Sequence, residues 1–220
     1  MGRPVPQPIA PTLLSHPGNP FQQAAYSAIR ISPGECRISD DPGVQLVTIL
    51  GSCVAACVTD PAARIGGMNH FMLPKSDHGY WGPDRASLRF GNFAMEQLIN
   101  DVLAHGGRRN HLQVKLFGGA NLLRARSNVG WKNAAFAEAY VAAEGLTLVA
   151  RHLYGFQPRL IHYLPVTGRV AMLELRDNTI RSCIKAESKH LRSLETKPLD
   201  GSIELFAEEG LNADPSPDRR

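Results

Sequence analysis

A cysteine and a histidine in this chain are placed where they could act together in nucleophilic catalysis. Cys53 follows Gly51 and Ser52 at the end of an apolar run, and His70 comes 17 residues later. A Gly-Ser bend interrupts a strand, so the sulfur of the next residue is presented at the edge of the sheet. Backbone N–H groups of the bend can then converge on an oxyanion. A free thiol has a pKa of about 8.5 and needs a nearby imidazole to become a thiolate. Cys53 is therefore a candidate nucleophile with His70 as its base, and Gly51 and Ser52 are candidate oxyanion and substrate-binding residues.

The same residues also have a purely structural interpretation. Free cysteines are often buried as small hydrophobic residues, and a strand histidine flanked by methionines is typical of a satisfied core position. A metal pair of Cys53 and Cys57 with His70 or His78 is another alternative. The chain lacks a second closely spaced ligand pair, and zinc would occupy the nucleophile. We therefore expect no metal and no other cofactor, and interpret Cys57 as a core residue.

The segments around these residues predict one domain of mixed α and β structure. Strands are predicted over residues 44–50, 54–59, 65–73, 112–117, 146–153, 159–164 and 169–175. The first three are apolar on both faces, which indicates burial on both sides. One helix is predicted from apolar residues at helical spacing that stop at Gly106, and a second from Asn133 as its cap to Gly145. The apolar positions of the first helix are Met95, Leu98, Ile99, Val102 and Leu103.

Both ends of the chain differ in composition from this domain. The chain has 220 residues and 43% hydrophobic content, which suits a single core, here predicted over residues 26–194. Residues 1–25 are proline-rich and predicted to be a disordered arm, and residues 195–220 a flexible tail. An apolar island interrupts that tail at Ile203, Leu205 and Phe206. This island either packs on its own domain or docks on a partner.

Charge and the distribution of apolar residues exclude several classes of function. The 24 basic and 20 acidic residues are interspersed and leave a net charge of +4, which argues against nucleic-acid binding. The first 20 residues contain six prolines and no continuous apolar stretch, unlike a secretory signal. No later run is long and apolar enough to span a membrane. We therefore expect a cytoplasmic protein with reduced cysteines.

Five separate motifs lie between residues 44 and 175. They are LGSCVAAC at 50–57, GGMNHFMLP at 66–74, RFG at 89–91, KLFGGA at 115–120 and PVTGRV at 165–170. Together they resemble the signature of the CheD family of chemoreceptor glutamine deamidases. A chance match to one motif would not bring the others in the same order. One departure is Trp131, where a charged residue is usual in the family.

The resemblance implies an activity and a set of catalytic residues. The chain would hydrolyse glutamine side chains of chemotaxis receptors to glutamate, with the family nucleophile at Cys53 and the family histidine at His70. The third catalytic residue of the family is a threonine in the strand that leads into the bend. Thr48 is the only threonine in that strand, and a shift of one residue in register would instead place Val47 there.

The resemblance also implies a fold and partners. The CheD family resembles toxin domains that deamidate a glutamine on small GTPases. The two groups share the catalytic cysteine and histidine and the layered arrangement of sheets and helices. This implies an α/β sandwich of two mixed β-sheets with flanking helices in a single domain. The implied partners are the cytoplasmic coiled coils of methyl-accepting receptors and a phosphatase of the CheC type. A regulatory binding module without essential catalysis and a thiol peptidase remain alternatives, since a peptidase uses the same pair of residues.

Overall fold

The computed structural model describes residue 21 and residues 26–73, 85–122, 128–175, 185, 187–190 and 192. Apart from Phe21, the predicted arm up to residue 25 and the predicted tail with its apolar island lie outside these residues. Phe21 is buried, with its ring edge-on to Tyr26 at a centroid distance of 6.3 Å. Within the described part of the chain, no helix has the length and apolar character needed to cross a membrane.

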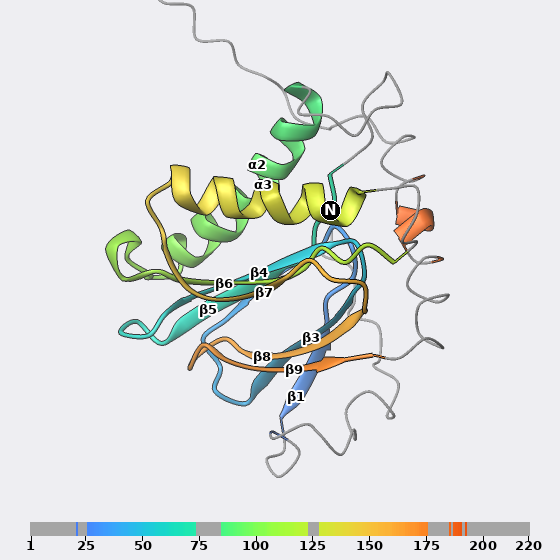
Figure 1. Ribbon diagram of the computed structural model, residues 1–220. Helices are drawn as coiled ribbons and strands as arrows, with labels where there is room; N and C mark the ends of the chain where they lie inside the picture. The colour runs from blue at the N-terminus through green and yellow to red at the C-terminus, as the bar shows by residue number, and fades with distance from the viewer. Residues whose placement is uncertain are drawn as a thin grey trace, which may run out of the picture.

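Two β-sheets pack face to face, and two helices cover the outer face of the larger sheet (Figure 1). The smaller sheet has the strand order β1 (Ser27–Arg30), β3 (Val44–Leu50), β8 (Arg159–Leu164) and β9 (Arg169–Glu174). The larger sheet has the order β2 (Cys36–Ser39), β5 (Ile65–Asn69), β4 (Val54–Asp60), β6 (Gln113–Gly118) and β7 (Thr147–Leu153). Each sheet contains one parallel pair, β1 with β3 and β6 with β7, among antiparallel ones. The predicted sandwich of two mixed sheets with flanking helices is confirmed.

The observed strands include all seven that the sequence predicts. Two further strands, β1 and β2, are not predicted, because each has only four residues and lies at the edge of its sheet. Such half-exposed edge strands lack the apolar alternation that marks a strand in sequence. The predicted strand over 65–73 ends earlier, at Asn69, and is followed by a single bridge between Val54 and Phe71.

The start predicted for the second helix is wrong. Helix α3 (Val129–Ala143) begins after Asn128, and Asn133 lies inside it, fully buried. The Asn133 side chain does not cap the helix. It accepts a hydrogen bond from the Leu73 amide at 3.0 Å and donates one to the Ser52 carbonyl at 2.8 Å. Asn133 therefore connects distant parts of the chain, whereas the sequence pattern suggested that it caps the helix. A short 3₁₀ helix, η1 (Arg109–His111), precedes β6.

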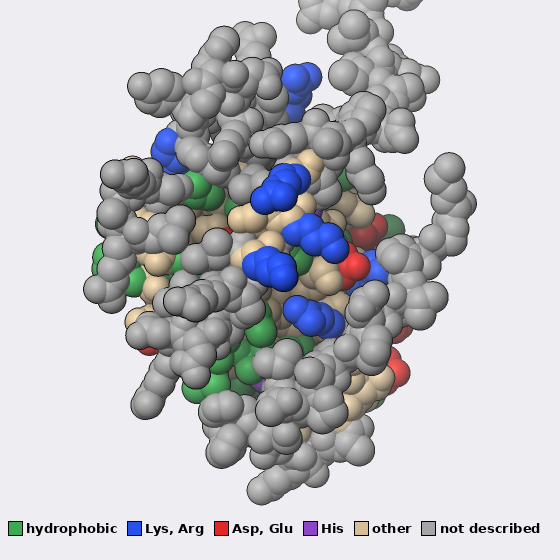
Figure 2. All heavy atoms as spheres, turned by 90° about the vertical axis from the view of Figure 1, so that its right-hand side faces the viewer, with side chains coloured by type: hydrophobic (Ala, Val, Ile, Leu, Met, Phe, Trp, Pro, Cys, Tyr) green, Lys and Arg blue, Asp and Glu red, His purple; other side chains and the backbone are tan. Residues whose placement is uncertain are grey.

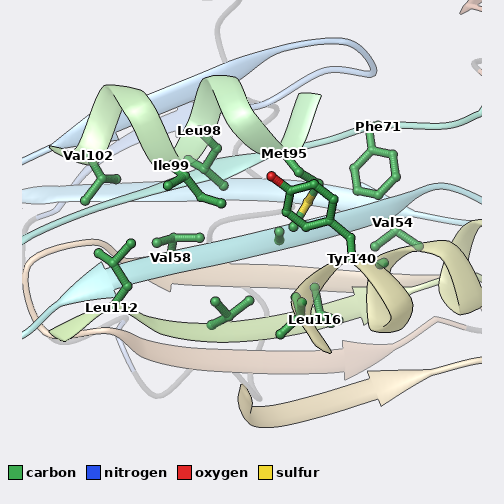
Figure 3. Close-up of a cluster of buried hydrophobic side chains, with 14 of the residues drawn as sticks. Val54, Val58, Phe71, Met95, Leu98, Ile99, Val102, Leu112, Leu116 and Tyr140 are labelled. Carbon is green, nitrogen blue, oxygen red and sulfur yellow. The ribbon is translucent and has the colours of Figure 1, made fainter. Parts of the chain in front are cut away.

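The outer core lies between the helices and the larger sheet (Figure 3). Helix α2 (Arg85–Ala104) confirms the predicted helical spacing, because Met95, Leu98, Ile99 and Val102 are buried and Leu103 is partly buried. Figure 3 shows Leu98, Ile99 and Val102 of this helix above Val58 of β4. The helices thereby cover the face of the sheet that points away from the second sheet.

The inner core lies between the two sheets. Alternate residues of β4 belong to the two cores, because successive side chains of a strand point to opposite faces. Val54 and Val58 join the outer core, whereas Cys53, Ala55 and Cys57 join the inner one. This confirms burial on both faces of the central strands. It also places Cys53 in the layer where the two sheets meet.

Candidate active site

The start of β4 brings Cys53 next to His70. Val54 and Phe71 exchange two backbone hydrogen bonds of 2.9 Å. In this antiparallel register Cys53 lies opposite Met72 and diagonal to His70, with both side chains on the face toward the inner core. Diagonal neighbours across such a pair are about 7–8 Å apart, within reach of a ring side chain. The register therefore places the predicted nucleophile and base as diagonal neighbours on one face of the sheet, both of them buried.

The backbone of His70 is held by a loop that follows β1. Its amide donates to the Glu35 carbonyl at 3.0 Å, and its carbonyl accepts from the Gly34 amide at 2.7 Å. The ring is held from the opposite sheet, where Thr48 Oγ1 of β3 lies 2.8 Å from His70 Nδ1. Thr48 faces the inner core, so its neighbour Val47 points to the other face of β3. Of the two residues considered for the third position, Thr48 is the one that contacts His70.

The hydrogen bonds of Thr48 determine the tautomer of His70. The hydroxyl of Thr48 donates its only proton to the Ile31 carbonyl at 2.7 Å, since a carbonyl can only accept. Thr48 Oγ1 must then accept from His70 Nδ1–H, which leaves Nε2 unprotonated. Within the described part of the chain, Nε2 has no hydrogen-bond partner. Burial lowers the pKa of His70 to about 3, so the ring is neutral and its Nε2 carries no proton.

Replacing Thr48 with valine tests this contact. The substitution keeps the volume but removes the acceptor of the Nδ1 proton, so the imidazole loses its fixed orientation. We expect kcat to fall about tenfold with little change in KM, which corresponds to one hydrogen bond of about 1–1.5 kcal/mol. Steady-state kinetics on a receptor peptide measures this change. Thr59→Val removes another buried hydroxyl, bonded to Tyr163, and serves as the matched control with unchanged kcat. An equal fall in both variants would show that Thr48 acts only through stability.

The bend that carries Cys53 is held by the glycine turn after β6. The Gly51 carbonyl accepts from the Ala120 amide and the Cys53 carbonyl from the Gly119 amide, both at 2.8 Å. Gly118 has φ +109, and a Cβ there would lie 2.2 Å from the Cys53 carbonyl oxygen. No other residue fits this position. The KLFGGA motif therefore positions the bend, a role that its sequence alone did not indicate.

Two hydrogen-bond donors of the bend bind a carboxylate of the same chain. The Cys53 amide donates to Glu187 Oε1 at 3.2 Å, and the Ser52 hydroxyl donates to Glu187 Oε2 at 2.6 Å. Gly51 contributes space, because a Cβ at this position would lie 2.7 Å from Glu187 Oε1. The bend thus presents an anion-binding pair of donors beside the Cys53 sulfur. Sequence reasoning missed Glu187, since no motif marks it and it lies 134 residues beyond Cys53.

The other described cysteines have the properties of structural thiols. Burial raises the pKa of Cys36 to about 12 and also raises the pKa of Cys57. Cys57 lies in the inner core, which confirms its interpretation as a core residue. Among the described residues no group of three or more His, Cys, Asp or Glu side chains is arranged to hold a metal ion. His78 lies outside those residues.

Comparison with known proteins gives one consistent family. Residues 72–174 match the family model described as CheD chemotactic sensory transduction. A Rhodopseudomonas palustris protein named probable chemoreceptor glutamine deamidase CheD is 48% identical over 81% of this chain and 84% of its own length. Proteins of the same name from Acidiphilium cryptum and Saccharophagus degradans are 47% and 42% identical, over 81% and 83% of this chain and 93% and 86% of their own lengths. Among solved structures, a Neisseria meningitidis protein aligns over 70% of this chain and 78% of its own with 11% identity and a TM-score of 0.39, too low to carry an inference.

Proposed function

Since the chain belongs to the CheD family, we propose that it is a protein-glutamine deamidase that converts glutamine side chains of chemotaxis receptors to glutamate. The curated relatives carry the name of that activity. The observation that carries the proposal is the site itself. A buried thiol lies diagonal to a neutral imidazole with an available Nε2, beside two donors that already bind a carboxylate.

In the first half of the reaction Cys53 forms a thioester with the substrate. His70 Nε2 takes the thiol proton as the sulfur attacks the carboxamide carbon of the glutamine. The negative charge that develops on the carboxamide oxygen is stabilised by the Cys53 amide, while the Ser52 hydroxyl accepts a hydrogen bond from the carboxamide NH₂. The Nε2 proton then passes to the amide nitrogen, the C–N bond breaks and ammonia leaves.

In the second half water releases the product. His70 Nε2 takes a proton from water as its oxygen attacks the thioester carbon. The C–S bond breaks, the proton on Nε2 returns to the Cys53 sulfur, and the side chain leaves as a carboxylic acid that releases its remaining proton to become glutamate. Throughout both halves Thr48 keeps the Nδ1 proton in place, which is the role of the third group in a catalytic triad. The reaction consumes one water and releases one ammonia.

The substrate of this reaction is a receptor side chain. We propose that the modified glutamines lie on the cytoplasmic coiled coil of methyl-accepting receptors and that the protein acts in the cytoplasm. Each conversion adds a negative charge to a helix, which alters packing between helices and creates a carboxylate that can be methylated. A phosphatase of the CheC type is proposed as a second partner.

Mass spectrometry of receptor peptides incubated with the purified protein tests the proposal. We expect glutamine residues to gain the mass that separates a carboxylic acid from an amide, with the peptide backbone intact. Cleaved peptides would instead identify a thiol peptidase. Binding without any mass change would identify a regulatory binding module. Either of these results would overturn the deamidase assignment.

A further inference from the structure

The two donors beside Cys53 are occupied by a carboxylate from the C-terminal part of the chain. Glu187 lies in a helical segment of which residues 185, 187–190 and 192 are described, and its side chain is buried. The segment follows the residues that match the family model. Both carboxylate oxygens are bound, one by the Cys53 amide and one by the Ser52 hydroxyl.

This carboxylate has the chemistry of the reaction product. Hydrolysis of a glutamine leaves a glutamate side chain, and Glu187 presents that group to the donors expected to hold the reacting carbonyl. The Cys53 amide donates to an oxygen in either case. The Ser52 hydroxyl donates to a carboxylate oxygen, and it can equally accept from the NH₂ of a carboxamide. The same position therefore accommodates glutamine before the reaction and glutamate after it.

The segment also covers the histidine side of the site. His190 Cε1 lies 2.7 Å from the place of a Cβ on Gly34, and Gly34 pairs with the backbone of His70. Among the described residues of the segment, the exposed ones are basic, namely Lys185, Lys189 and Arg192. In Figure 1 the segment lies at the right, and Figure 2, which views that side, shows several Lys and Arg side chains gathered there.

We propose that Glu187 is an internal product analogue, and that the helical segment around it inhibits the enzyme by occupying the position of the substrate carboxamide. The proposal rests on the deamidase function proposed above. A receptor glutamine binds only when Glu187 has left its two donors. The apparent KM is then the KM of the open site divided by the fraction of molecules in which the segment is displaced.

Replacing Glu187 with alanine removes the competing group. We expect KM for a receptor peptide to fall about tenfold with kcat nearly unchanged. This fall corresponds to an unaltered protein in which the site is open in about one molecule in ten. Lys189→Ala, an exposed position in the same segment, is the matched control and should keep the KM of the unaltered protein. A KM equal in all three proteins would overturn the proposal.

Alkylation of Cys53 by iodoacetamide tests the same contact without using the deamidase activity. Glu187→Ala should raise the rate at Cys53 about tenfold, because no carboxylate is then bound to the Cys53 amide and the Ser52 hydroxyl. The rate is read from fragment ions that separate Cys53 from Cys57 four residues later, so that alkylation of Cys57 or of Cys36 does not contribute. An unchanged rate would overturn the proposal even if receptor peptides are not substrates.

Replacing Glu187 with glutamine tests whether this position is the substrate position. The introduced carboxamide would meet Cys53 and its donors, so the protein should convert it back to glutamate by itself. Peptide mass spectrometry after purification should find glutamate in this variant and glutamine in the double variant that also carries Cys53→Ala. If the variant deamidates receptor peptides but keeps its own amide, the product-analogue proposal fails and the proposed function stands. If the unaltered protein leaves receptor peptides unchanged, the proposed function fails, and the alkylation rate alone decides whether the segment covers Cys53.

Discussion

Cys53→Ala is expected to abolish the conversion of receptor glutamine to glutamate. Without the sulfur there is no thioester, and only the hydrogen-bond donors of the bend remain to promote attack by water. Loss of the nucleophile in a comparable triad enzyme lowers kcat by a factor on the order of 10⁶. The side chain is small and buried, so the fold should lose only about 1 kcal/mol of stability, as for a typical point substitution. Mass spectrometry of receptor peptides at long incubation times measures the residual rate.

Cys57→Ala provides the control for this substitution. Cys57 lies in β4 and is buried in the inner core like Cys53, but it is four residues further along the chain. We expect this variant to keep its rate within a few fold. Normal deamidation by Cys53→Ala would rule out the assigned nucleophile. Normal chemotaxis in cells that carry Cys53→Ala would favour the binding-module alternative, because an adaptor does not need the thiol.

His70→Ala is expected to lower kcat by a factor of about 10² to 10⁴, the usual contribution of a general acid and base. The thiol would lose the acceptor of its proton, and the departing ammonia would lose its donor. Single-turnover measurements on a receptor peptide separate this loss from changes in binding. His162→Ala is the matched control, because His162 is a buried histidine of β8 that contacts Gln45. A similar loss in both variants would show that burial of the ring, and not its Nε2, is what matters.

Because the pKa of His70 is lowered, His70→Ala should also change how protein stability depends on pH. The unfolded chain takes up a proton on His70 below its ordinary pKa of 6.5, whereas the folded chain does so only near 3. Between these values the unfolded state binds more protons, so the free energy of unfolding decreases as the pH falls. We expect His70→Ala to show a smaller loss of melting temperature between pH 7 and about 4 than the unaltered protein. Equal pH dependence in both would mean that the ring is not buried in its neutral form.

Local patterns in the sequence determined most of the secondary structure. The bounds of β3 and β8 agree with the sequence prediction, because the turn residues that flank these runs are local signals. Helix α2 was found from the spacing of its buried face, which depends only on the helical period. The bend before Cys53 was likewise visible as a Gly-Ser pair at the end of an apolar strand.

Only the tertiary structure decided how the site is assembled. The Nδ1 proton of His70 is placed by Thr48 and Ile31, which reach it from the other sheet only because the two sheets pack face to face. Asn133, which the sequence suggested as a helix cap, reaches the carbonyl of Ser52 across 81 residues of chain. Glu187 contacts the bend from 134 residues away. Hydrogen bonds between segments so distant in the chain depend on the packing of whole layers, and local residue patterns do not specify that packing.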